Sequence, residues 1–124
     1  SNNCMAYFQF SKVKEVLGAT GTQDDKKIQH YGEMADALIN SYLTDVRDKK
    51  GVTEFLQVPV TASDFVSTAE FNILIDIANQ LAVGYFYKFE SGDTSTADQA
   101  ESVWVRFFQS KWQRPKFAVR GAEY

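Results

Sequence analysis

The feature that most constrains the fold is the stretch of residues 63–89. Drawn as a helix, it has one narrow polar stripe, and its remaining faces are apolar. Its polar positions follow the spacing i, i+4, i+7, i+8: Asn72, Asp76, Asn79 and Gln80. A helix with a single narrow polar stripe must be covered on several sides, so it is predicted to be the core helix. Ser63 and Asp64 are predicted to cap its start, and Gly92 follows its end.

Residues 25–46 predict a second long helix with one buried face. Thr22 precedes Asp24 and Asp25, whose charges complement the positive end of a helix dipole. The apolar residues after them recur with the spacing of one helical face: Ile28, Tyr31, Ala35, Leu38, Ile39, Tyr42, Leu43 and Val46. This face is expected to pack on the core helix.

Two further helices are predicted at either end of the chain. Ser11 is expected to cap a helix of two turns that stops at Gly18. After the polar turn 91–95, Thr94 or Thr96 is expected to cap a longer helix. One face of that helix holds Ala97, Ala100, Val103, Trp104, Phe107, Phe108 and Trp112.

These elements predict an all-α fold, a small helical bundle of three long helices and a short N-terminal helix. With 124 residues, 44% of them apolar, the chain has material for one hydrophobic core and is expected to form a single domain over 1–124. Residues 47–62 are predicted to be a long loop between helices, and residues 115–124 an extended C-terminal arm.

The loop and the arm carry apolar side chains that do not follow a helical period. A lone small domain has little surface with which to bury such segments, so we expect them to contact other chains in a ring of identical subunits. The predicted interface residues are Phe55, Leu56, Val58, Pro59, Arg114, Lys116, Phe117, Val119 and Arg120.

The sequence offers few candidates for catalysis, and we expect neither an enzyme nor a bound cofactor or metal. His30 is the only histidine and lacks a partner at i+4 for a zinc pair, so it is predicted to lie at the surface. The charges of Asp24 and Asp25 are explained by the helix start. Asp76 is expected to face solvent or another subunit, with a catalytic carboxylate as the less favoured alternative.

Two other functional classes are weakened by composition. The net charge is −3, which argues against nucleic acid as the main partner, although residues 103–124 are locally basic. The aromatic residues of the last helix alternate with cations and offer a stacking platform as an alternative, but their helical spacing favours packing on the core helix. The longest apolar run, 71–89, is interrupted by polar residues, so no membrane span is expected.

Several segments resemble the head–tail connector, or adaptor, proteins of tailed bacteriophages. The likeness rests on a short capped helix "FSKVKEVLG", a polar turn "ATGTQDD" and a long helix "KKIQHYGEMADALINSYL". After a loop containing proline, "EFNILIDIANQLAVGYFY" is similar to the alanine-rich core helix of that family. These patterns cover most of the chain and are loose, and they include no catalytic motif.

The resemblance implies a virion structural protein made in the host cytoplasm, a location that suits a chain whose only cysteine is Cys4. Its copies would form a ring under the portal protein, bind tail or stopper proteins below, and let DNA pass through the lumen without sequence-specific contact. Two alternatives remain open from the residues: a cellular helical module for protein–protein interaction, and a small nucleic-acid-binding helical protein.

Overall fold

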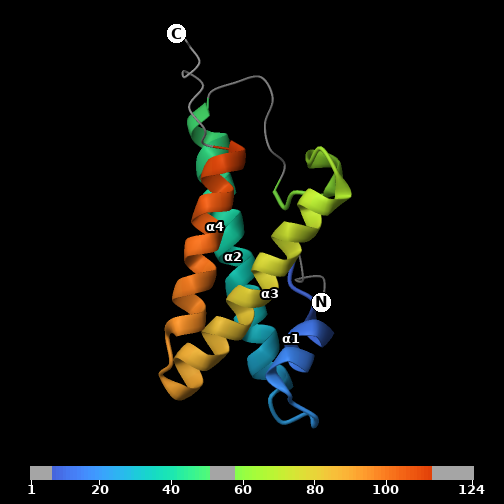
Figure 1. The fold of residues 1–124 in the computed structure, drawn as a ribbon, viewed down its shortest axis with the longest axis vertical. Helices are drawn as coiled ribbons and strands as arrows, with labels where there is room; N and C mark the ends of the chain where they lie inside the picture. The colour runs from blue at the N-terminus through green and yellow to red at the C-terminus, as the bar shows by residue number, and fades with distance from the viewer. Residues whose placement is uncertain (1–6, 51–57, 113–124) are drawn as a thin grey trace.

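The computed structural model describes residues 7–50 and 58–112, with the backbone alone for 45–50. This part of the chain contains helices and no strand, as Figure 1 shows. Its elements are α1 (Phe10–Leu17), α2 (Asp25–Lys50), the short 3-10 helix η2 (Ala62–Asp64), α3 (Thr68–Ser91) and α4 (Ser95–Trp112). The predicted all-α bundle of three long helices and a short N-terminal one is confirmed.

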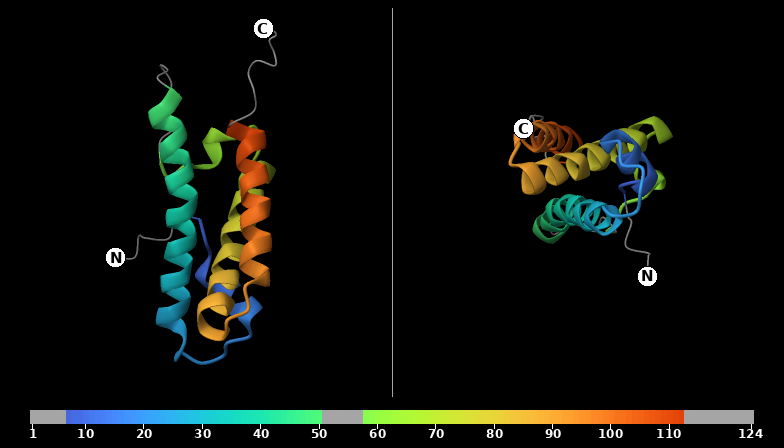
Figure 2. Two further views of the ribbon diagram at one scale, coloured as in Figure 1. Left: turned by 90° about the vertical axis from the view of Figure 1, so that its left-hand side faces the viewer. Right: turned by 90° about the horizontal axis from the view of Figure 1, so that it is seen from below.

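Helix α3 is the centre of the arrangement. It packs against both α2 and α4, and α1 lies across one end of α2 and α3 (Figure 2). The side view in Figure 2 looks between α2 and α4, with α3 behind them. The prediction that this helix needs cover on several sides is therefore confirmed.

The core follows the apolar faces that the sequence predicted. The fully buried side chains of α2 and α3 include Ile28, Ile39, Leu43, Leu74 and Leu81. From α4, Trp104 is 0% exposed and Phe108 only 3%. Burying side chains of this size contributes about 1.5–3 kcal/mol each, which makes these faces the main source of stability.

Helix ends with glycine are as predicted, whereas the predicted starts of α1 and α3 are wrong. Gly18 and Gly92 end α1 and α3 in the left-handed conformation, with φ of 75° and 80°. Helix α1 begins one residue before Ser11, and no side chain caps it. Ser63 belongs to η2, and α3 is instead capped by Ser67, whose hydroxyl accepts from the Glu70 amide.

Two other boundaries differ from the sequence prediction. Helix α2 runs to Lys50, so the loop begins later than residue 47. Before α4, neither predicted threonine caps the helix through its side chain in the described contacts; instead Asp93 Oδ1 accepts from both the amide and the hydroxyl of Ser95, at 3.0 and 2.8 Å. These bonds lower the pKa of the Asp93 carboxyl.

The contact between α3 and α4 is close enough to require glycine. A Cβ atom on Gly84 would lie 2.5 Å from the backbone N and Cα of Ala97. Backbone atoms cannot move aside as a flexible side chain does, so any larger residue here would push the start of α4 away from α3.

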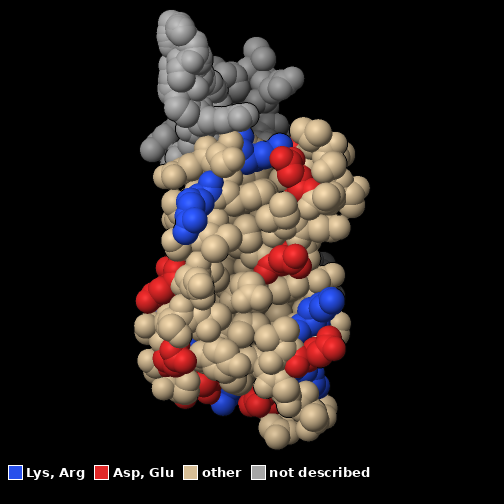
Figure 3. Space-filling model, viewed as in Figure 1, with Lys and Arg blue, Asp and Glu red and all other residues tan. Residues whose placement is uncertain are grey.

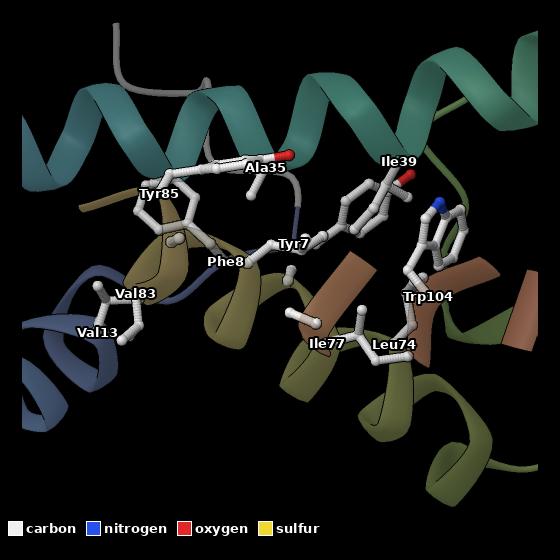
Figure 4. Close-up of a cluster of buried hydrophobic side chains, with 14 of the residues drawn as sticks. Tyr7, Phe8, Val13, Ala35, Ile39, Leu74, Ile77, Val83, Tyr85 and Trp104 are labelled. Carbon is white, nitrogen blue, oxygen red and sulfur yellow. The ribbon is translucent and has the colours of Figure 1, made fainter. Parts of the chain in front are cut away.

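A segment before α1 is held between α2 and α3, which the sequence did not predict. The backbone N–H groups of Tyr7 and Phe8 both donate to Oδ1 of Asp36, at 3.2 and 3.1 Å. Asp36 is only 4% exposed. Both aromatic side chains point into the core, as Figure 4 shows, so this buried carboxylate fixes the start of the chain to α2.

The same segment holds the end of the long loop. The Tyr7 hydroxyl donates to Asn40 Oδ1 at 2.6 Å and accepts from the Val60 amide at 3.0 Å. Burial raises the pKa of this hydroxyl to about 12. Val60 is 2% exposed and Val58 is partly buried against the core, while Pro59 is exposed. The described end of the loop therefore packs on the rest of the same chain.

Candidate interaction surface

A groove runs along α3 and α4 on the side away from α2. Its volume is about 340 Å³. Figure 3 views this face of the molecule. The face is largely uncharged, and most of its charged side chains lie toward its edges. The groove is lined by Ile73, Asp76, Ile77 and Gln80 of α3, and by Thr96, Gln99, Ala100 and Val103 of α4.

Two of the lining side chains are large, apolar and still open to solvent. Ile73 is 47% exposed and Val103 is 43% exposed, one on each wall of the groove. Covering the remaining surface of each would contribute roughly 1 kcal/mol. Isolated exposed apolar residues need no explanation, but two that line the same groove form a candidate surface for another chain.

Asp76 supplies the charge of this groove. It is exposed, as predicted, and it forms no ion pair within the described residues. Asn72 and Gln80, on the same polar stripe, are exposed too, whereas Asn79 of that stripe is buried. Asn79 is 9% exposed and exchanges two hydrogen bonds with Gln9, at 2.7 and 3.1 Å, because the segment before α1 covers that part of the stripe.

The aromatic residues of α4 mainly pack inside the bundle. Trp104 and Phe108 are buried, and both contact the Tyr42 ring edge-on with centroids 5.7 and 5.1 Å away. Phe107 and Trp112 are partly buried against the same core. The core interpretation of the aromatic face is confirmed, and these rings do not form an open stacking surface.

The cations of α4 differ in their surroundings. Lys111 lies 4.9 Å from the centre of the Phe65 ring and 3.3 Å from Glu70 Oε1. Arg106 is exposed. Lys111 therefore interacts with residues of its own chain, which leaves fewer cations on this helix for an external anion.

A second groove lies between α2 and α4. It has a volume of about 460 Å³, is widely open, and is lined by both charged and apolar side chains, among them Leu38, Asp98 and Arg106. Trp104 forms part of its floor, and the indole Nε1 of Trp104 is buried without a hydrogen-bond partner among the described residues. The mixed lining gives this groove a weaker apolar character than the one between α3 and α4.

The residues weighed for catalysis do not converge on one site. His30 is exposed and lies beside the Tyr31 ring, with centroids 5.3 Å apart. Asp25 begins α2 as predicted and pairs with Lys14 at 2.8 Å. No group of three or more His, Cys, Asp or Glu that could hold a metal occurs in the described residues. Over that same part of the chain, no helix has the length and apolarity to cross a membrane.

One exposed polar cluster joins α2 to the end of α3. Glu90 accepts from the Tyr31 hydroxyl at 2.6 Å and pairs with Lys27 at 3.0 Å. The hydrogen bond from Tyr31, and then the one from Lys27, lower the pKa of the Glu90 carboxyl. The same hydrogen bond raises the pKa of Tyr31 to about 12. This cluster holds the two helices together rather than forming a cleft.

The interface residues predicted from sequence fall mostly outside the described part of the chain. Phe55, Leu56, Arg114, Lys116, Phe117, Val119 and Arg120 lie there, which leaves Val58 and Pro59. Val58 and Pro59 do not line the groove between α3 and α4. Sequence reasoning missed Ile73 and Val103 because it assigned both to buried faces; only the three-dimensional packing shows that each lies at the edge of its face.

Comparisons of the chain with family models, with curated proteins and with solved structures give no match.

Proposed function

We propose that this chain is a structural subunit that assembles with further copies of itself through the groove between α3 and α4. The observation that carries the proposal is the pair of half-exposed apolar side chains in this groove, Ile73 from α3 and Val103 from α4. A lone copy leaves both in contact with water, and a neighbouring chain would cover both.

The sequence resemblance gives the proposed assembly its biological setting, the head–tail connector of a tailed bacteriophage. In that role the chain forms a ring beneath the portal protein, binds tail or stopper proteins, and resides in the virion. The chain's net charge of −3 suits a DNA passage, because like charge keeps the passing DNA from binding to the wall. A contact between different faces of neighbouring copies closes into a ring when its rotation permits.

The test has two stages, because assembly and viral role are separate claims. First, light scattering on the purified full chain measures its mass over a range of concentrations, and negative-stain images show the shape of any larger species. Ring-shaped particles support the proposal. A species that stays a monomer or compact dimer contradicts it and favours a cellular interaction module.

Second, the purified chain is mixed with purified rings of the portal protein encoded in the same phage genome. Co-sedimentation that saturates at a fixed number of copies per portal supports the connector role. If the chain assembles but does not bind the portal, the assembly claim holds and the connector claim fails. Retention on DNA that weakens steeply with salt and disappears when Arg106, Lys111, Arg114 and Lys116 lose their charge would instead favour a nucleic-acid binder.

A further inference from the structure

We infer that the groove between α3 and α4 of one copy binds the C-terminal segment, residues 113–124, of a neighbouring copy. This inference rests on the proposed function and names the contact that would hold the assembly together. The groove needs an occupant with a few apolar side chains, because its walls carry Ile73, Ile77 and Val103 and its volume is about 340 Å³. A groove of this size accommodates a few side chains of one segment.

The sequence of the C-terminal segment matches this groove in side-chain type. Phe117 and Val119 are two residues apart, so in an extended chain both point to the same side. That spacing allows both to enter the groove together, between Ile73 on one wall and Val103 on the other.

The two surfaces also match in charge. The groove carries Asp76, which has no ion pair among the described residues. The segment carries Arg114, Lys116 and Arg120, with Glu123 as its only side-chain carboxylate. A cation beside Asp76 adds a modest attraction that salt weakens, and it gives the segment a preferred direction in the groove.

The segment is long enough to reach a neighbouring copy. Helix α4 ends at Trp112, and residues 113–124 follow it. Extended outward, these twelve residues span roughly 40 Å, which is enough to cross to an adjacent copy. The proposed assembly places the segment in a neighbour's groove, because a contact within one chain would not join two copies.

Disulfide trapping between separately purified variants tests this contact. All variants carry Cys4→Ser, so that each has one introduced thiol. One variant carries Val103→Cys in the groove, and the other carries Phe117→Cys in the C-terminal segment with a removable affinity tag that changes its mass. Mild oxidation of the mixture, followed by a non-reducing gel, shows which pairs form. The matched control replaces the groove variant with Val16→Cys, a valine on α1 that is more exposed, at 58%, than Val103.

The expected result is a mixed disulfide between the Val103→Cys and Phe117→Cys chains, at least tenfold more abundant than the one with Val16→Cys. The inference is overturned if the pairing with Val103→Cys and the control pairing with Val16→Cys give equal yields. It is also overturned if a chain with both substitutions closes on itself at monomer mass, because the segment then binds its own copy.

Light scattering on the unmodified chain separates the failure of this inference from the failure of the proposed function. A chain that assembles but gives no selective mixed disulfide refutes the C-terminal contact alone. A chain that remains a monomer at every concentration refutes both claims. A second variant, Asp76→Lys, is expected to lower the yield of the mixed disulfide several-fold, and reversing Arg114, Lys116 and Arg120 to Glu in the partner is expected to restore it.

Discussion

Replacing Asp36 with alanine should remove the anchor of the segment that precedes α1. Oδ1 of this carboxylate accepts from the amides of Tyr7 and Phe8, and both residues are buried, at 1% and 3% exposure. Each of these two buried donors that loses its acceptor costs about 1–3 kcal/mol, so Asp36→Ala should lower the free energy of unfolding by about 2–6 kcal/mol. This is a large share of the 5–15 kcal/mol typical of a small domain.

Urea unfolding followed by circular dichroism measures this loss, at protein concentrations low enough to keep the chain monomeric. The matched control is Asp76→Ala, because Asp76 is an exposed aspartate without an ion pair in the described residues; its change should stay within about 0.5 kcal/mol. Asp36→Asn keeps a side-chain oxygen as acceptor and should lose less than Asp36→Ala. The reasoning is refuted if the two alanine variants unfold at the same urea concentration.

Three further outcomes are expected. Gly84→Ala should lower the free energy of unfolding by about 1–3 kcal/mol, because the added Cβ would meet the backbone of α4. Helix propensity alone favours alanine by about 1 kcal/mol, so a stabilised variant would contradict the close contact. Tyr31→Phe should raise the pKa of Glu90 in an NMR titration, and an unchanged Glu90 pKa would refute this. The wild type should then be more stable than the variant above the ordinary carboxyl pKa, and this difference should shrink as the pH falls through the lowered pKa of Glu90 in the folded wild type. Cutting the chain after Arg114 should leave its helical circular dichroism intact and abolish assembly, whereas an unfolded product would place the C-terminal segment in the core.

The helical architecture could be predicted because its signals are local. The apolar spacing of residues 25–46 identified α2, and the glycines at 18 and 92 marked two helix ends. The starts were less secure, because residues 61–67 hold three hydroxyl side chains that can cap a helix, Thr61, Ser63 and Ser67. The structure shows that Thr61 caps η2 and that Ser67 caps α3. Competing caps of this kind cannot be ranked from sequence.

The contacts that join distant segments had no local signal. Asp36 lies 29 residues from Tyr7 along the chain, and Asn79 lies 70 residues from Gln9. A single aspartate in an amphipathic helix is ordinarily a solvated residue, so its burial depends on a partner that the local pattern does not specify. The same holds for Val60. The sequence placed it in a loop expected to contact other chains, whereas it is buried in its own chain, where its amide donates to the Tyr7 hydroxyl.

The groove between α3 and α4 was predicted only in part. The sequence placed Asp76 on an exposed stripe, and the structure confirms its exposure. It also placed Ile73 and Val103 on apolar faces, but how far each face is covered depends on how α4 lies against α3. The distance between two helices is set by contacts such as that of Gly84 with Ala97, which periodicity does not specify.

The most direct test of assembly through this groove is the mass of the chain in solution as a function of concentration, measured by light scattering for the wild type and for Val103→Asp. Val103 is 43% exposed, so the aspartate can remain in water and the fold should be retained, which circular dichroism checks. The account predicts that the wild type gains mass in multiples of one chain as concentration rises, while the folded variant stays a monomer. A wild type that remains a monomer throughout, or a variant that assembles equally well, would contradict it.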